Sequence, residues 1–446
     1  MRGSPNDCCH IVVIVDPLEN TIKAMSSHNT VTLLTSRNPS PSSSTPPSHH
    51  IGTPPTHFQN PWPSVSKKSL LDFFSTRFSS NRNFVPVPST RDELVKVRKP
   101  DWGASLDPTG TGLKATWIGH ASWLLETGTT GSASRGVRIL CDPVFSERTS
   151  PVQWTGPKRY TPTPCTVAEL PEVDAVVISH NHYDHLDFGT IKELYTKQQG
   201  RVPHVFCALG NKQWFLDAGV GITKEDVTEL DWWEGGLLEV ADVGKVELWS
   251  VPCQHNSARS GWDQNRTLWC SWVIKECGDE GGQVISDSVP TAVPTSHTAQ
   301  TSSPRSLYFA GDTAYRSVTS ASPTPDEEAS APHCPAFSEI GNVFGPFDLA
   351  LLPIGLFMPR NIMSSVHCSP EDSACVHVDI KAKRSIGMHY GTVRGGISGQ
   401  YEDVRVPPRR WREVCEERGW KWRGEGQEDG DWEAGLCDVG ETVVIR

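Results

Sequence analysis

The stretch Val176–Asp187, VVISHNHYDHLD, holds three histidines and two aspartates directly after a short apolar run. The apolar run predicts a buried strand, and alternate residues of the extended chain point the same way. His180 and His182 can therefore offer two imidazoles to one ion, while the following turn swings Asp184 and His185 toward a neighbouring position. Imidazole and carboxylate together suit zinc, and iron and manganese are compatible with them as well. This stretch alone fits either a structural or a catalytic metal site.

Further residues of ligand type end three later apolar runs. His255 ends VELWSVPCQH, Asp312 ends LYFAGD, and His389 follows SIGM in SIGMHYG. Each residue taken alone is more often structural than catalytic. Together they supply the ligands that a second metal ion needs, so the sequence indicates a two-metal site.

The surrounding sequence has the pattern of strands and helices that is typical of an α/β domain. From Ala115 onward, short apolar runs end in polar or glycine-rich turns, and segments with helical periodicity such as GTIKELYTKQQ and NKQWFLDAG lie between some of them. We expect the strands to deliver their terminal residues to one edge of the fold.

The pattern H-x-H-x-D-H, followed by His, Asp and His on later strands, resembles the metallo-β-lactamase superfamily. The resemblance implies a four-layer αββα sandwich with a dinuclear site at one edge, where a hydroxide held by two metals attacks an electrophilic carbon or phosphorus. The GHAS segment is not a Gly-x-Ser-x-Gly elbow, and no Ser or Cys nucleophile is evident. Carried over residue by residue, the resemblance assigns His180, His182 and His255 to one zinc ion, Asp184, His185 and His389 to the other, and Asp312 to a bridge between them.

A narrower resemblance covers Phe58 to Gly391. The segments TWIGHASWLLE, ILCDPVFSERTSPVQWTGPKRYTPTPC, ELPEVDAVVISHNHYDHLD, ELDWWE, FAGDTAY and MHYGT closely resemble the N-acyl-phosphatidylethanolamine-hydrolysing phospholipase D family. That resemblance implies hydrolysis of the phosphodiester on the ethanolamine side, releasing phosphatidic acid and an N-acylethanolamine. It also implies a phospholipid substrate met at a peripheral membrane surface, and suggests a homodimer.

The same resemblance places three more residues around the site. We interpret Asp142 as a group that orients a ligand histidine, and His120 and His367 as contacts to phosphate or proton shuttles. Asp184 and Asp312 could also steer protons. Turn stabilisation is the alternative for His120, Asp142 and His367.

The chain departs from the family pattern near His367. The residue before Pro370 is Ser369 where the family has Asp. The preceding GLFMPRNIMSSVH is rich in apolar side chains, which suits either a lining for acyl chains or plain core.

Low-complexity segments set the expected domain limits. Residues 1–57 are rich in Ser, Thr and Pro and are predicted to be disordered, and residues 58–446 are predicted to form one hydrolase domain. Two Ser/Thr/Pro-rich tracts, 277–306 and 316–333, are expected as surface insertions. In KKSLLDFFSTRF, Leu70, Leu71, Phe74 and Phe78 share a helical stripe; we favour a helix docked on the core over an apolar, basic-edged surface for lipid.

Composition narrows the partners and the compartment. A net charge of −11 argues against a broad basic face for nucleic acid, and no apolar run is long enough to span a bilayer. The 13 scattered cysteines favour reduced thiols in an intracellular setting, the cytoplasm or the cytoplasmic face of a membrane. The absence of Asp and Glu between Thr21 and Leu71 gives weak support for mitochondrial targeting.

Three other functions share some of these features. A lactonase of the same superfamily could carry GHAS and FAGDT, and a pre-tRNA endonuclease uses the same metal cluster but is disfavoured by the acidic net charge. A non-catalytic lipid-binding scaffold would be expected to have lost metal ligands, whereas every candidate ligand is retained here.

Overall fold

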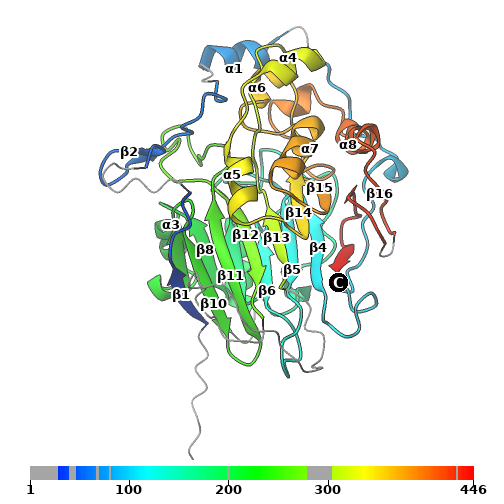
Figure 1. The fold of residues 1–446 in the computed structure, drawn as a ribbon. Helices are drawn as coiled ribbons and strands as arrows, with labels where there is room; N and C mark the ends of the chain where they lie inside the picture. The colour runs from blue at the N-terminus through cyan, green and yellow to red at the C-terminus, as the bar shows by residue number, and fades with distance from the viewer. Residues whose placement is uncertain are drawn as a thin grey trace, which may run out of the picture.

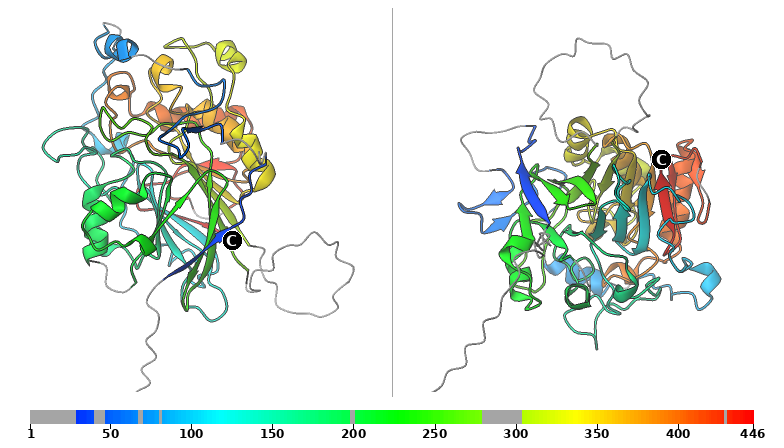
Figure 2. Two further views of the ribbon diagram at one scale, coloured as in Figure 1. Left: turned by 90° about the vertical axis from the view of Figure 1, so that its left-hand side faces the viewer. Right: turned by 90° about the horizontal axis from the view of Figure 1, so that it is seen from below.

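The computed structural model describes residues 29–39, 47–66, 70–79, 82–197, 201–278, 304–427 and 430–446. Within these residues the strands form two large sheets that pack face to face, together with a small two-stranded hairpin (Figures 1 and 2). The hairpin joins β2 (His50–Ile51) to β3 (His57–Phe58).

The larger sheet of the described residues has the strand order β1-β10-β11-β12-β13-β14-β15-β17-β16. Its pairs are antiparallel from β1 to β13 and parallel from β13 to β16. The strands are β1 (Thr30–Leu34), β10 (Gly235–Val240), β11 (Gly244–Val251), β12 (Ser271–Glu276), β13 (Ser306–Phe309), β14 (Leu349–Pro353), β15 (Ser385–Met388), β17 (Ala434–Gly435) and β16 (Trp422–Arg423).

The smaller sheet of the described residues has the order β18-β4-β5-β6-β7-β8-β9. Strands β6 to β9 are parallel, so their carboxyl ends share one edge. The strands are β18 (Thr442–Ile445), β4 (Leu113–Gly119), β5 (Ser122–Glu126), β6 (Arg138–Cys141), β7 (Ala175–Ile178), β8 (His204–Ala208) and β9 (Val227–Leu230).

Helices cover the outer face of each sheet. Helices α2 (Phe188–Lys197) and α3 (Lys212–Asp217) bury Ile191, Leu194 and Phe215 in one apolar cluster with side chains of the smaller sheet. Helices α5 (Ala336–Val343), α7 (Pro370–Asp379) and α8 (Val406–Glu417) bury apolar side chains in the cluster that contains the larger sheet. The predicted four-layer αββα sandwich is therefore confirmed.

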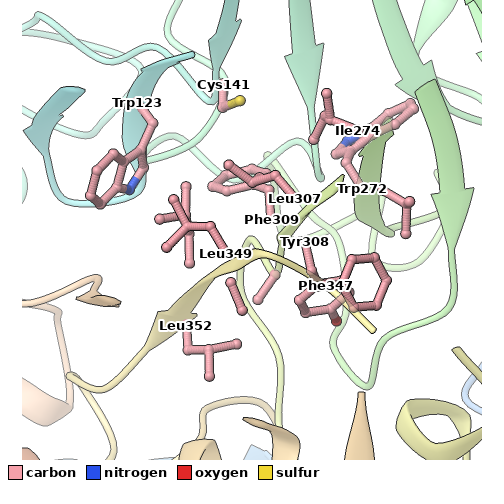
Figure 3. Close-up of a cluster of buried hydrophobic side chains, with 14 of the residues drawn as sticks. Trp123, Cys141, Trp272, Ile274, Leu307, Tyr308, Phe309, Phe347, Leu349 and Leu352 are labelled. Atoms are coloured by element: carbon pink, nitrogen blue, oxygen red, sulfur yellow. The ribbon is translucent and has the colours of Figure 1, made fainter. Parts of the chain in front are cut away.

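Alternation along β13 fills two layers at once. Leu307 and Phe309 belong to the same core cluster as Trp123 and Cys141 of the smaller sheet (Figure 3). Tyr308 points the other way, and its ring lies 5.7 Å from that of Phe347. A strand buried on both faces reads as a continuous apolar run, because every side chain needs an apolar neighbour.

The prediction that residues 1–57 are disordered is wrong over residues 47–57, which hold β2 and the start of β3, and over Thr30–Leu34. Thr30–Leu34 forms β1, which pairs antiparallel with β10 at the edge of the larger sheet. The sequence TVTLL has high strand propensity, and Val31 and Leu34 pack against the core beside the free edge of β10. Residues 1–28 lie outside the described part, as does some of the stretch considered for mitochondrial targeting.

Helix α1 (Leu70–Arg77) forms where its periodicity predicts, but it does not bury the predicted apolar face. Leu71, Phe74 and Phe78 are 79%, 60% and 72% exposed. The favoured interpretation, a helix docked on the core through these side chains, is wrong. Helix α1 lies beside α6 (Arg360–Met363) instead.

The two tracts expected as insertions differ in what the structure shows. Most of 277–306 lies outside the described residues. The tract 316–333 contains α4 (Pro325–Ser330), whose residues are largely exposed, and a strand bridge from Arg316 to His333 closes its base. Arg360 Nε binds Glu328 Oε1 at 3.0 Å, which fastens this tract to α6.

Other features complete the fold. Short 3₁₀ turns occupy Arg91–Glu93, Val167–Glu169, Lys224–Asp226 and Ser398–Gln400. The cysteines in the described residues are free thiols, and most are buried. Among the helices of the described ranges, none is both long and apolar enough to cross a membrane.

Candidate metal centre

The candidate ligands gather where strands of both sheets end. Asp142 follows β6 and His180 follows β7 in the smaller sheet, whereas His255, Asp312 and His389 follow β11, β13 and β15 in the larger one. Parallel strands deliver their carboxyl-terminal residues to one edge. The two sheets therefore bring the predicted residues to one place from five strands.

His180, His182 and His255 form the first group of ligand atoms. His180 Nε2 lies 2.8 Å from His182 Nδ1, and His255 Nε2 lies 3.3 Å from the same atom. The other nitrogen of His255 lies 2.7 Å from the carbonyl oxygen of Val366. That contact aims Nε2 of His255 at the other two imidazoles.

Asp184, His185 and His389 form the second group, and the structure adds His120 to it. His185 Nε2 lies 3.3 Å from His389 Nε2, and Asp184 Oδ2 lies 3.9 Å from each of them. His120 Nε2 lies 3.0 Å from Asp184 Oδ2. Asp184 keeps 26% of its side chain exposed, whereas the three histidines of this group are buried.

Asp312 lies between the two groups. Its Oδ1 is 2.8 Å from His389 Nε2, and its Oδ2 is 3.2 Å from His185 Nε2 and 3.8 Å from His255 Nε2. One carboxylate thus reaches both sets of imidazoles, which is the placement that a bridging ligand requires.

Asp142 reaches the centre through a neighbouring histidine. Its Oδ2 lies 2.7 Å from His185 Nδ1, while the hydroxyl and backbone N–H of Ser179 donate to the same carboxylate at 2.5 Å and 2.7 Å. With Nδ1 of His185 engaged by Asp142, its Nε2 faces Asp312. That Asp142 orients the ligand His185 stays a prediction, and these contacts support it.

His367 lies at the rim of the centre, in the loop between α6 and α7. Its Nδ1 is 3.7 Å from Asp312 Oδ2, and its ring stacks on that of His389 with 5.5 Å between centroids. Burial lowers the pKa of His367 to about 4, although Asp312 opposes that shift. His367 is therefore neutral at physiological pH.

Three of the site residues adopt left-handed backbone conformations. His120, Asp142 and His389 have φ values of 56°, 38° and 62°. Non-glycine residues rarely adopt such values, and they cluster where the surrounding structure holds a functional geometry in place. Here the backbone N–H of His389 donates to the carbonyl of His120 at 3.0 Å.

Electrostatics keep His180, His255 and Asp312 in the forms that bind cations. At His185 burial is outweighed by the carboxylates of Asp312, Asp184 and Asp142, which raise the pKa, so a metal ion binding there displaces a proton. Burial holds the pKa of His180 and of His255 well below the usual range, so both imidazoles are neutral. Burial disfavours the charge on Asp312, but His389 and His185 outweigh it and hold the pKa of this carboxyl low. Burial lowers the pKa of His120 to about 3, with His389 acting in the same direction.

The donor set fits metal ions. The described residues place buried imidazoles and carboxylates in two adjoining groups, and none of them makes an aligned hydrogen bond to the buried Oδ1 of Asp312, although His389 Nε2 lies 2.8 Å away. A buried anionic oxygen without a donor is costly unless a cation pairs with it. Nitrogen and oxygen ligands suit zinc, and iron and manganese are compatible with them. The chain thus contains a metal site, and the predicted pair of zinc ions remains a prediction.

Comparison with known proteins decides the family. The family described as "Beta-lactamase superfamily domain" matches residues 137–285 and 288–390. The chain is 34% identical over 297 residues to N-acyl-phosphatidylethanolamine-hydrolyzing phospholipase D 1 of Caenorhabditis elegans, covering 66% of this chain and 68% of that one. The chain belongs to the N-acyl-phosphatidylethanolamine-hydrolysing phospholipase D family, within the metallo-β-lactamase superfamily. It is a metallo-β-lactamase-fold, metal-dependent hydrolase.

Two further similarities are more distant. N-acyl-phosphatidylethanolamine-hydrolyzing phospholipase D, mitochondrial, of Saccharomyces cerevisiae is 27% identical over 381 residues, which cover 77% of this chain and 68% of that one. The solved structure of a possible metal-dependent hydrolase from Veillonella parvula aligns with 74% of this chain and 99% of its own at 16% identity, with a TM-score of 0.45.

Ser369, which stands where the phospholipase D family has Asp, has a clear structural role. Ser369 is the N-cap of α7, and its side chain accepts from the N–H of Asp372, whose carboxylate in turn accepts from the N–H of Ser369. Serine and aspartate are equivalent N-cap residues. The substitution therefore leaves the start of α7 and the loop that carries His367 intact.

Arg259 was not identified from the sequence, although it supports the loop that carries the H-x-H-x-D-H motif of the phospholipase D family. Its Nη1 donates to the carbonyl oxygens of Asn181 and Leu186 at 2.8 Å each, and its guanidinium lies 4.0 Å from the ring centroid of Tyr183. These contacts hold both ends of the loop that carries His182, Asp184 and His185. Arg259 lies in the polar stretch SARSGWDQNR, which has no pattern that would have singled it out.

Proposed function

We propose that the protein hydrolyses N-acyl-phosphatidylethanolamine to phosphatidic acid and an N-acylethanolamine, as a phosphodiesterase of the phospholipase D type. The observation that carries the proposal is a groove of about 610 Å³ that opens from the metal-ligand residue His255, in a chain of this family. Part of its wall is apolar: Ile51, Phe58, Val65, Ile362, Met363, Val366 and Ile397.

The groove has the character that an acyl chain needs. An apolar wall buries methylene groups at roughly 0.8 kcal/mol each, and His255, a ligand of the metal centre, borders the same groove. Ile362 and Met363, from the apolar stretch that we considered as an acyl lining, both border the groove. Leu356 of the same stretch is buried in another small cavity, beside Tyr390 and Glu402.

Helix α1 extends this apolar surface outward. It contacts α6, which carries Ile362 and Met363, and it exposes Leu71, Phe74 and Phe78. Solvent-exposed aromatic and aliphatic side chains on one helix suit insertion into the interfacial region of a bilayer. We propose that α1 docks on the membrane that supplies the substrate, so that acyl chains pass from the bilayer along α6 to the groove.

In the proposed reaction, water adds to phosphorus, the bond from phosphorus to the ethanolamine oxygen breaks, and that oxygen takes a proton. Bound metal ions would activate the water and neutralise the phosphate charge. Asp142 keeps His185 oriented, and His120 donates Nε2–H to Asp184. The neutral imidazole of His367, beside Asp312, can donate its N–H to a phosphate oxygen of the substrate.

The test is a product assay with purified protein. N-acyl-phosphatidylethanolamine, phosphatidylcholine, an aryl phosphodiester and simple lactones are incubated separately, and the products are identified by mass spectrometry. We expect release of an N-acylethanolamine that is abolished by a chelator and by Asp312→Asn. Asp217→Asn, a change at an exposed carboxylate on α3, is the matched control and should retain activity. Lactone hydrolysis with the lipid left intact would favour the lactonase alternative and overturn the proposal.

A further inference from the structure

A second cluster of metal-ligating side chains lies outside the metal centre. His49 Nε2 is 2.7 Å from Asp231 Oδ1, and His50 Nε2 is 2.8 Å from Asp231 Oδ2. The three ligand atoms lie within 4.8 Å of one another. His49 and His50 come from the N-terminal segment, whereas Asp231 lies between β9 and β10, so the cluster joins parts of the chain far apart in sequence.

The spacing of the cluster resembles that of the metal centre. Its two short separations, 2.7 Å and 2.8 Å, lie close to the 2.8 Å between His180 Nε2 and His182 Nδ1. Nε2 of His50 is buried and makes no hydrogen bond with any described residue, although Asp231 Oδ2 lies so near to it. A shared cation gives both atoms a partner without requiring hydrogen-bond alignment between them.

The surroundings hold these side chains in place. The ring of His49 stacks on Trp232 at 4.1 Å between centroids, and Trp232 stacks in turn on Trp62 at 5.4 Å. The backbone N–H of Trp232 donates to Asp231 Oδ1 at 2.7 Å. His49 is 6% exposed, and the side chains of His50 and Asp231 are 11% and 16% exposed. A site of this kind is ordered before an ion binds and still has a path to solvent.

We propose that His49, His50 and Asp231 bind a further divalent transition-metal ion of the zinc type, separate from the metal centre. Two imidazoles and one carboxylate supply three ligands, and water completes a tetrahedral shell. The sites are distinct because His49, His50 and Asp231 share no residue with the groups of ligand atoms that form the metal centre.

The bound ion would hold one wall of the groove in place. His50 begins the β2–β3 hairpin, and Ile51, His57 and Phe58 of this hairpin line the groove. Just beyond it, Asn60 Nδ2 donates to the carbonyl oxygen of His255 at 2.7 Å. Fixing His49 and His50 to Asp231 therefore fixes the wall of the groove beside the metal centre.

The experiment counts and locates metal ions in the full-length protein. In buffered zinc, mass-spectrometric metal analysis should give about three ions per chain for the wild type and about two for His50→Gln and for Asp231→Asn. His57→Gln removes a histidine from the same hairpin and should still give about three. Cooperative thermal unfolding shows that each variant is folded.

Anomalous diffraction from zinc-loaded wild-type crystals provides a measurement that needs no variant. We expect a zinc peak among His49, His50 and Asp231 in addition to the peaks at the metal centre. Peaks at the metal centre alone, or wild-type stoichiometry retained by both variants, would overturn the proposal. In that case the two histidines only pair with Asp231. Neither result depends on which substrate the enzyme hydrolyses.

Discussion

Asp142 Oδ2 lies 2.7 Å from His185 Nδ1, and neither side chain is exposed to solvent. A buried carboxylate on one nitrogen of a ligand histidine fixes its tautomer and raises its basicity. We expect Asp142→Asn to lower metal affinity and turnover by about 10- to 100-fold. Metal titration and steady-state kinetics on the same preparation measure both quantities.

Ser179→Ala is a milder variant to compare with Asp142→Asn. It removes the hydroxyl that donates to Asp142 and that also lies 2.9 Å from His180 Nδ1, but it leaves the contact between Asp142 and His185 in place. Because this hydroxyl acts on His185 only through Asp142, the loss of metal affinity should be smaller than that of Asp142→Asn, less than about tenfold. Equal metal affinity in the wild type and in Asp142→Asn would contradict the orienting role.

Arg259 is predicted to hold the ligand loop in position. Arg259→Met keeps much of the aliphatic stem but removes the donors to the carbonyl oxygens of Asn181 and Leu186. Loss of these charge-assisted bonds should destabilise the protein by about 2 to 4 kcal/mol and weaken metal retention. Urea unfolding and metal analysis after dialysis test both effects.

Arg266→Met is the matched control for Arg259→Met, because Arg266 lies in the same loop and is exposed. It should leave stability and metal content at wild-type levels. If the two variants behave alike, the contacts of Arg259 with the ligand loop have no special role.

The metal ligands could be predicted from the sequence because they follow apolar runs that indicate strands. His180 and His182 come two residues apart after an apolar run, and His255, Asp312 and His389 each follow one as well. The position of His120 beside Asp184 was not readable, because it depends on a left-handed turn between β4 and β5. The periodicity of apolar residues along the sequence does not indicate which turn a loop adopts.

The errors at the N-terminus have different physical causes. Thr30–Leu34 is too short to order itself, and it becomes a strand because β10 offers an unpaired edge. The stripe of α1 was predicted correctly, but helical periodicity says only that an apolar face exists. Whether that face meets the core or the solvent depends on tertiary packing, and Leu71 and Phe74 remain exposed.

The exposed face of α1 leads to a prediction about membrane binding. Replacing Phe74 and Phe78 together with Ser should weaken binding to phospholipid vesicles by about tenfold or more, because each ring would otherwise insert apolar area worth roughly 1.5 to 3 kcal/mol. Vesicle co-sedimentation measures this effect. Turnover of a soluble short-chain phosphodiester should stay unchanged.

Leu33→Ser provides the control for the α1 variant. Leu33 is 67% exposed on β1, at the opposite end of the molecule from α1 in Figure 1. Its loss should not alter vesicle binding. Undiminished binding by the Phe74 and Phe78 variant would rule out α1 as the docking surface.

His204 gives the protein a pH-dependent stability that is separate from the metal centre. Burial lowers the pKa of His204 from 6.5 to about 4, so the unfolded chain binds a proton more readily than the folded one. Its contribution is fully present above pH 6.5 and decreases as the pH falls toward 4. Between pH 7 and pH 5 the loss should be about 2 kcal/mol.

His204→Gln should reduce this pH dependence. Glutamine does not titrate and can keep a hydrogen bond to Thr228 Oγ1, which His204 Nε2 contacts at 2.8 Å. Urea unfolding at pH 7 and pH 5 compares the two proteins, which share the same metal centre. An identical fall in stability for both would show that His204 is not the responsible group.

The proposed function requires that water attacks phosphorus at the metal centre and releases the ethanolamine oxygen. Hydrolysis of N-acyl-phosphatidylethanolamine in ¹⁸O-labelled water, followed by mass spectrometry of both products, tests it most directly. We expect the label to enter phosphatidic acid and to be absent from the N-acylethanolamine, and we expect Asp312→Asn to yield neither product. Label in the N-acylethanolamine, or no cleavage of the lipid by the metal-loaded wild type, would contradict it.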